Sequence, residues 1–144
     1  MSVFRFSLEQ VLAYRKQLEE QAMLAFARAA EARDKRLREK ESLEAAILEN
    51  RANLAVTLDG DERWLITGYI AALTQDLETA VRDLIALEEE VDRARVELTQ
   101  RAQDRKLLEK LKEKQANRHR LAENHKEQQN YDDIATIRYT PKAV

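Results

Sequence analysis

Apolar residues in the second half of the chain recur at alternating steps of three and four residues. Between residues 66 and 98 this repeat fills ten successive positions without an interruption. A strict 3.5-residue repeat specifies the seam of a left-handed coiled coil, so a long helix over about residues 62–130 is predicted. Farther along, the same positions are mostly charged, and only Leu108 is apolar. The ten seam residues are Ile66, Ile70, Leu73, Leu77, Ala80, Leu84, Leu87, Val91, Ala94 and Leu98.

Another helix is predicted over about residues 7–58. Ser7 is a favourable N-cap, and Gln10 three residues later completes a capping-box pattern. Phe6 and Val11 have the spacing of a hydrophobic staple. The apolar positions then change phase, which indicates a four-residue stutter in the coiled coil. Those before the change are Leu8, Val11, Leu18, Ala22, Ala25, Ala29 and Ala32, and those after it are Leu43, Ile47 and Leu54.

A short turn at about residues 59–61 separates the two helices. Gly60 can adopt the left-handed conformation that ends a helix, and Asp61 can cap the next helix. A short turn makes the helices antiparallel neighbours, with paired residue numbers that sum to about 121. The first helix then covers the second only to about residue 115. We therefore predict an all-α fold, a single domain of 144 residues that forms a long two-helix antiparallel coiled-coil hairpin with a C-terminal helical overhang.

The overhang, residues 119–139, is charged and only weakly amphipathic. A lone polar helix is marginal in water because most helical stability comes from packing. Two interpretations stay open: a solvated, partly disordered tail, or a docking surface that becomes ordered on binding. Tyr131, Ile134 and Ile137 lie three residues apart and could form a small apolar face.

Composition argues against an enzyme. The chain is 36% charged, has two Gly and one Pro, and has no Cys, so thiolate chemistry is excluded. Two helices that touch along one stripe enclose no small-molecule pocket, so we expect no catalytic residue, no cofactor and no small-molecule substrate. His119 and Glu123 could share a helix face toward a metal, but solvated histidines are the simpler interpretation and we expect no metal. Without a secretory signal or an apolar stretch of about 18 residues, a soluble cytoplasmic protein is expected.

Three stretches of the sequence resemble the flagellar export protein family FliJ. They are "FRFSLEQVLAYRKQLEEQA" at the start, "RWLITGYIAALTQDLETAV" after the turn and "LAENHKEQQNYDDIA" near the end. The first is similar to the family's Phe-x-Phe-x-Leu…Val-Leu-x-x-Arg opening, and the last to its most characteristic C-terminal run.

The resemblance implies a non-catalytic, two-helix stalk of the flagellar type III export apparatus, similar in shape to the gamma stalk of rotary ATPases. Its implied partners are the ring of the export ATPase FliI, the cytoplasmic domain of the export gate protein FlhA, and export chaperones, at the inner membrane of the flagellar base. Tyr69 and Leu73 match the family's gate contacts, whereas its aromatic contacts before the turn have no match here. The residues placed at the ATPase ring are Phe4, Phe6, Arg15, Arg118, Arg120, Leu121, Glu123, Asn124, Gln128, Asp132 and Asp133.

Three alternatives remain open at this point. The first is the equivalent stalk of a virulence-type secretion system. The second is a generic coiled coil that binds nucleic acid, because residues 101–126 hold nine Lys or Arg and four Asp or Glu. No aromatic residue interleaves these cations, so no nucleic-acid partner is expected. The third is a parallel dimer between two chains, for which the second helix alone has enough seam.

Overall fold

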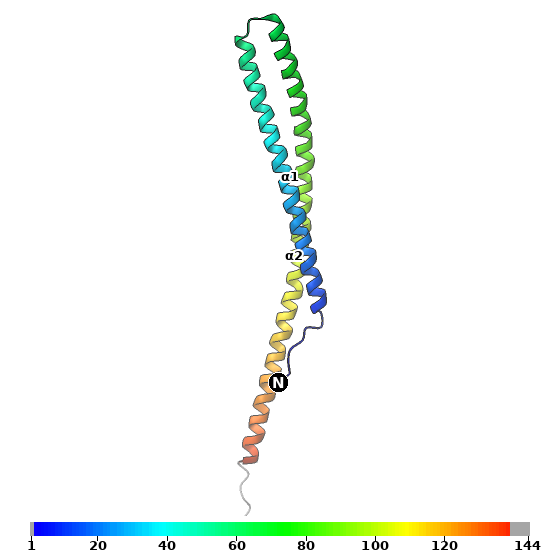
Figure 1. Cartoon of the computed structure of the whole chain (residues 1–144). Coiled ribbons are helices and arrows are strands. Elements are labelled where there is room, and N and C mark those ends of the chain that lie inside the picture. The colour runs from blue at the N-terminus through cyan, green and yellow to red at the C-terminus, as the bar shows by residue number, and fades with distance from the viewer. Residues whose placement is uncertain (1, 139–144) are drawn as a thin grey trace, which may run out of the picture. The chain divides into compact units, whose positions relative to one another are not determined.

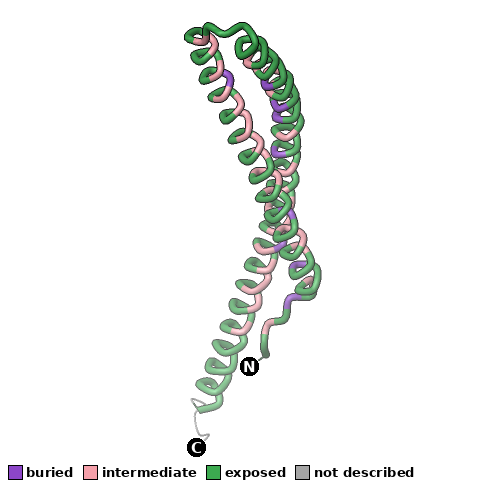
Figure 2. The backbone as a smooth tube through the Cα atoms, turned by 45° about the horizontal axis from the view of Figure 1, so that its top comes forward, coloured by how far each residue is buried: buried purple, intermediate pink, exposed green. Residues whose placement is uncertain are grey.

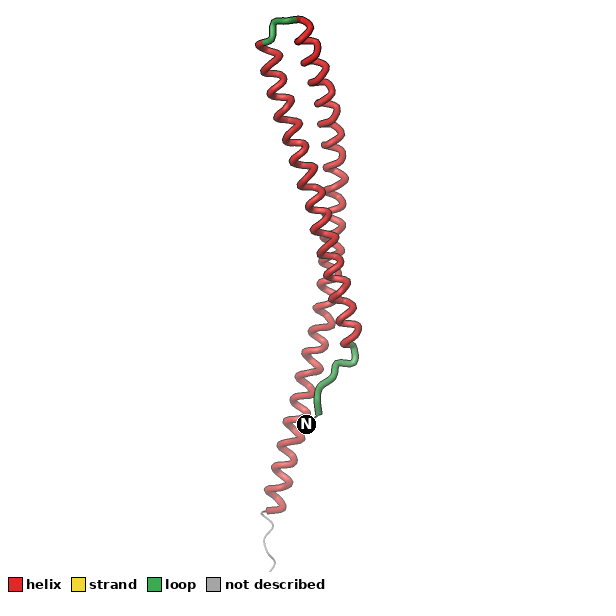
Figure 3. Tube along the Cα trace, viewed as in Figure 1, coloured by secondary structure: helices red, strands yellow, loops and turns green. Residues whose placement is uncertain are grey.

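The computed structural model describes residues 2–138, which form two helices, α1 (Glu9–Val56) and α2 (Gly60–Arg138), as Figures 1 and 3 show. Residues 57–59 connect the helices, and no strand occurs within the described range. Contacts group the chain into two units, of which the first contains residues 1–19 and 101–144 and the second contains residues 20–100. In each unit a segment of α1 packs against a segment of α2, so the predicted all-α helical hairpin is confirmed. Neither helix, as far as it is described, contains a stretch apolar and long enough to cross a membrane.

Burial along α2 follows the predicted seam. All ten seam residues are buried or half-buried, whereas most residues between them are exposed, and Figure 2 shows this alternation. Val91 and Ala80 have the smallest exposed fractions, 1% and 0%. The repeat therefore continues through the positions where the sequence predicted it.

Burial along α1 follows an equally regular repeat, and the predicted stutter is wrong. Val11, Ala25 and Ala32, which were assigned to the seam, are exposed. Charged and amide side chains occupy about half of the observed seam positions. The pattern of apolar residues alone therefore assigned the wrong positions of α1 to the seam. The buried and half-buried seam residues of α1 are Leu12, Arg15, Glu19, Ala22, Phe26, Ala29, Arg33, Arg36, Lys40, Leu43, Ile47, Asn50 and Leu54.

Polar contacts fix the pairing of the helices within the second unit. Arg36 on α1 donates through Nη2 to Asp83 Oδ2 on α2 at 2.8 Å, and through Nη1 to Glu39 Oε2 at 2.6 Å. The hydrogen bond to Glu39, followed by the interaction with Asp83, raises the pKa of Arg36. The Arg95 guanidinium lies over the Phe26 ring, 5.8 Å from its centroid. Arg36 with Asp83 and Phe26 with Arg95 have numbers that sum to 119 and 121, close to the predicted antiparallel pairing.

The connection differs from the predicted turn. Gly60 is the first residue of α2, and no glycine of the described residues has a positive φ, so the predicted left-handed Gly60 is wrong. The amide of Arg63 donates to the Asp59 carbonyl at 3.0 Å, which places Asp59, rather than Asp61, at the N-cap of α2. The Arg63 side chain then reaches back to α1, where Nη1 donates to the carbonyls of Leu54 at 2.7 Å and Thr57 at 2.9 Å. Arg63 thereby satisfies carbonyls that the end of α1 leaves unpaired.

In the first unit, a small apolar cluster lies at the start of α1. Phe6, Leu12 and Leu108 are buried together, with Phe4 and Leu8 packed against them. The first α-helical hydrogen bond of α1 runs from Leu12 N to Leu8 O at 2.9 Å, so Leu8 holds the N-cap position predicted for Ser7. Val11 remains 40% exposed and is not part of the cluster, so the proposed staple between Phe6 and Val11 is not formed.

Charged side chains hold the rest of the first unit together. Arg105 on α2 donates to Glu19 on α1 and, through Nη1, to Glu109 Oε2 at 2.7 Å. These two hydrogen bonds, the one to Glu19 first, raise the pKa of Arg105. Lys112 Nζ lies 2.8 Å from Glu9 Oε2, and Arg15 Nη1 donates to the Asp104 carbonyl at 2.8 Å. The chain thus continues the seam with ion pairs where the apolar repeat ends.

Candidate interaction surfaces

Residues 2–8 form an N-terminal strap that lies against α2 within the first unit. The Ser2 hydroxyl donates to Glu123 Oε1, and the Ser2 carbonyl oxygen lies 3.1 Å from His119 Nε2. The Phe4 ring contacts the His119 ring, with centroids 5.8 Å apart. The expected loss of partners after about residue 115 is therefore corrected: α1 itself ends its cover there, but the strap extends the partnered part of α2 to Glu123.

Electrostatics favour the charged form of Glu123 at the end of this strap. The hydrogen bond from the Ser2 hydroxyl is the main cause that lowers the pKa of Glu123, and the charges of Lys126 and His119 add to it. Burial acts in the opposite direction without cancelling these effects. His119 and Glu123 are thus engaged by the strap, and no cluster of metal-binding side chains occurs in the described part of the chain.

The last part of α2 is helical and lies beyond the contacts that α1 and the strap make with α2 at Lys112, His119 and Glu123. Every residue from 124 to 138 is exposed. Tyr131, Ile134 and Ile137 are 72%, 47% and 74% exposed, so the small apolar face proposed from their spacing is open to solvent. Tyr139, which ended the predicted overhang, lies outside the described residues. We call residues 124–138 the lone segment of α2.

The structure divides the residues expected at the ATPase ring into two groups. Phe6 is buried in the apolar cluster, Phe4 is half-buried, and Arg15 and Glu123 are held by hydrogen bonds. These four side chains are engaged in contacts within the first unit and are less available to a partner than the exposed residues. The exposed residues are Arg118, Arg120, Leu121, Asn124, Gln128, Asp132 and Asp133.

The two residues expected at the export gate also differ. Tyr69 is 55% exposed on α2, whereas Leu73 is a buried seam residue with 7% exposure. Trp64 is 75% exposed as well, so Tyr69 and Trp64 do not close the end of the core. Tyr69 is therefore available to a partner, and Leu73 packs below it in the seam.

Sequence reasoning missed a group of exposed apolar residues around the connection. Val56, Leu58, Trp64 and Leu65 have exposed fractions between 63% and 96%. The signal was present in the sequence, because none of these residues falls on a seam position. Together with Tyr69, they make the connection an apolar end of the second unit, bordered by the carboxylates of residues 59–62.

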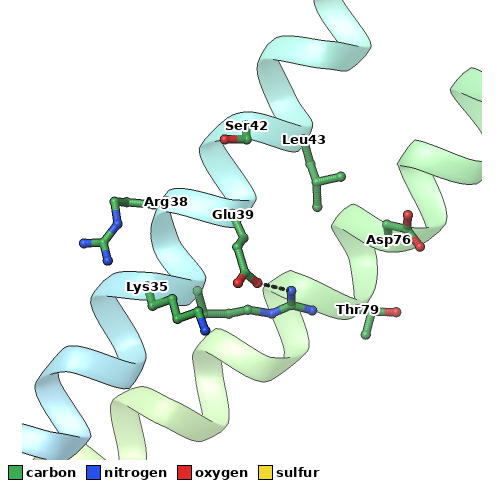
Figure 4. Close-up of a pocket in the computed structure, with 8 residues that line it drawn as sticks. Lys35, Arg38, Glu39, Ser42, Leu43, Asp76 and Thr79 are labelled. Atoms are coloured by element: carbon green, nitrogen blue, oxygen red, sulfur yellow. Dashed lines mark hydrogen bonds and ion pairs between the residues drawn. The ribbon is translucent and has the colours of Figure 1, made fainter.

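The second unit also has an open groove between α1 and α2, which Figure 4 shows. Its volume is about 770 Å³. Figure 4 shows a dashed contact from Glu39 to Arg36, while Asp76 and Thr79 lie on α2. The lining residues are Lys35, Arg36, Arg38, Glu39, Ser42, Leu43, Asp76 and Thr79. The lining holds three cations and two carboxylates, and it contains no histidine or cysteine.

These features define a class of proteins: antiparallel two-helix coiled coils that expose apolar and charged side chains on the outside of the helices. Within this class, the chain belongs to the flagellar FliJ protein family, whose model matches residues 4–143. The fold is also similar to the solved structure of the YscO homologue CT670 from Chlamydia trachomatis. The TM-score is 0.54 at 20% sequence identity, and the match covers 94% of each chain. A comparison with curated protein sequences gave no match.

Proposed function

We propose that this chain is a non-catalytic stalk and escort component of the flagellar type III export apparatus. The observation that supports it most is the family match over nearly the whole chain, together with a helical segment, residues 124–138, that is exposed throughout. In this proposal the first unit enters the ring of the export ATPase FliI. The protein works in the cytoplasm at the flagellar base, associates peripherally with the inner membrane, and meets export chaperones there.

The lone segment supplies the contact with the ring. Its exposed side chains include Asn124, Gln128, Asp132 and Asp133, and Arg118, Arg120 and Leu121 lie just before it. One asymmetric rod inside a symmetric ring touches the ring subunits unequally. Unequal contact can favour the closed, nucleotide-holding state of one subunit over another, which couples the stalk to ATP hydrolysis.

A truncation after Glu123 tests the ring contact. The cut removes the lone segment but keeps Ser2, His119 and Glu123, so the strap and the paired helices should remain folded. We expect the truncated protein to retain its helical circular dichroism per residue and to lose stimulation of the purified export ATPase. Full stimulation by the truncated protein would overturn the proposal.

Tyr69 supplies the contact with the export gate in the same proposal. Its ring is exposed beside the apolar end of the second unit, and exposed aromatic side chains are frequent anchors of interfaces. Tyr69→Ala should weaken binding to the cytoplasmic domain of FlhA and leave ATPase stimulation intact. The Tyr69 variant and the truncation therefore serve as controls for each other, because each should affect one partner only.

A second candidate is the equivalent stalk of a virulence-type secretion system. The structural similarity to the YscO homologue favours it, although a likeness at 20% identity shows a shared fold only. The two candidates separate when the protein is mixed with the ATPase of either system. Stimulation of the flagellar enzyme alone supports the first candidate, and stimulation of the virulence-system enzyme alone supports the second.

A further inference from the structure

One side of the first unit is apolar and the other is not. Within residues 9–19 and 101–115, four large apolar side chains are exposed by 37–64%. They are Val11, Tyr14, Leu107 and Leu111. None of them belongs to the residues proposed for the ATPase ring or the export gate, so their exposure has no explanation so far.

These four residues lie on the same side of the helix pair. Val11, Tyr14 and the half-buried Leu18 from α1 line one hollow of about 320 Å³, together with Arg101 and Asp104 from α2. Leu107 and Leu111 follow Asp104 by three and seven residues, so they continue along the same side of α2. We call Val11, Tyr14, Leu18, Leu107 and Leu111 the apolar face.

A row of cations borders the apolar face on α2. Lys110, Lys114 and Arg118 are exposed and follow one another at four-residue spacing. No ion pair joins these three to another described residue, whereas Lys112 on the seam is paired with Glu9. The positive charge of this row is therefore available to a partner.

The opposite side of the same helix pair provides a contrast. On that side α1 carries Glu9 and Lys16 and α2 carries Glu109 and Glu113, and none of the large exposed apolar residues of these segments belongs to it. Charged side chains of both signs are typical of a solvated helix surface. The combination of apolar centre and basic edge is thus confined to one side.

We propose that the apolar face is a docking site for an acidic amphipathic helix of a partner protein, which packs as a third strand of the coiled coil. Two helices with apolar residues on a flank, next to the seam, present the groove that a third helix fills. The partner's apolar side chains would cover Tyr14, Leu107 and Leu111, and its carboxylates would face the cation row. The inference does not depend on the ring contact proposed above, because the apolar face contains none of the ring residues and Arg118 alone of the cation row is shared with them.

Charge decides against a second copy of this chain as the occupant. A twofold-symmetric dimer buries the same surface from both copies. The cation rows of the two copies would border one interface, where like charges repel. An acidic helix turns the same cations into favourable contacts.

The experiment uses the full-length protein and a fluorescein-labelled synthetic helix of about three heptads, with Leu at the a and d positions and Glu on the flanks. Its twin carries Lys in place of every Glu. Fluorescence anisotropy should show binding of the acidic helix and at least about tenfold weaker binding of the basic twin. The double variant L107Q/L111Q should weaken binding of the acidic helix by about tenfold or more, because two apolar contacts are lost.

The matched control is I85Q/V96Q, which removes two exposed apolar side chains of the second unit and should leave binding unchanged. The charge variant K110E/K114E should reverse the preference toward the basic twin. Equal binding of the two helices, or equal loss in L107Q/L111Q and the control, would overturn the proposal. Sedimentation that shows a dimer abolished by L107Q/L111Q would also overturn it, since the occupant would then be a second copy.

Discussion

Individual charged residues decide how the two helices pair. Arg36 and Arg105 each occupy a seam position, where a coiled coil ordinarily places an apolar side chain. Each long side chain covers the seam with its methylene groups and brings its guanidinium to carboxylates at the edge. Because Asp83 and Glu19 lie opposite these two arginines, only one antiparallel alignment satisfies both pairs.

Reversing the charge of Arg105 tests this role. Arg105→Glu would place a third carboxylate beside Glu19 and Glu109, so we expect a lower melting temperature by circular dichroism. The exchange variant R105E/E19R should recover part of the loss, because it restores an opposite pair across the helices. Arg82→Glu, at an exposed position, is the control and should change the melting temperature little. Equal losses in Arg82→Glu and Arg105→Glu would contradict the assigned role.

Glu123 gives the strap a dependence on pH. Its pKa in the folded protein lies below that of the unfolded chain, which is about 4.3 for a glutamate. The contact with Ser2 therefore contributes stability above that pH and loses it as the pH falls through the lowered pKa. Nuclear magnetic resonance should show the Ser2 and His119 signals change in this acidic range, and Glu123→Gln should remove that change. A Glu123 carboxyl that titrates as it does in an isolated peptide would disprove the contact.

At the scale of helices, the accuracy of sequence reasoning follows the chemistry of the seam. The α2 seam was predictable because apolar residues fill it from Ile66 to Leu98. The α1 seam was not, because residues such as Arg33, Arg36 and Lys40 lie on it, and a pattern of apolarity cannot place a charged core position. The strap has no periodicity, so only its contacts with His119 and Glu123 reveal it.

The interior of α2 contains one residue that weakens the helix without an evident packing reason. Gly68 lies in the helix, and a Cβ built there meets nothing within 4 Å. Gly68→Ala should raise the free energy of unfolding by about 0.5–1 kcal/mol, since alanine loses less conformational entropy than glycine. Urea unfolding measures this change. The exposed Ala71→Gly is the matched reverse control and should lower the free energy by a similar amount.

For the whole molecule, the decisive prediction was that function lies on outer surfaces. The sequence indicated which segments carry exposed residues, and the lone segment of α2 is exposed throughout. The sequence could not show which aromatic or apolar residues would become buried by packing. Phe6 is buried in the apolar cluster and Leu73 is buried in the seam. Their burial depends on contacts between segments that are far apart in the chain.

The antiparallel pairing can be tested in solution because the natural chain has no cysteine. Phe26 on α1 and Arg95 on α2 face each other within the second unit, where the guanidinium carbon of Arg95 lies 5.8 Å from the centroid of the Phe26 ring. The variant F26C/R95C, treated with a short bis-maleimide at low protein concentration, should give a crosslinked monomer on a denaturing gel. A crosslinked dimer would instead support the parallel pairing of two chains that the sequence left open.

The strap also allows the uncovered length of α2 to change. Only a few exposed contacts hold residues 2–4 to His119 and Glu123, and exposed contacts of this kind open at small free-energy cost. When they open, residues 115–123 lose their cover and join the lone segment. At 1.5 Å per residue, the bare shaft would lengthen by about 13 Å, without any change in the paired helices.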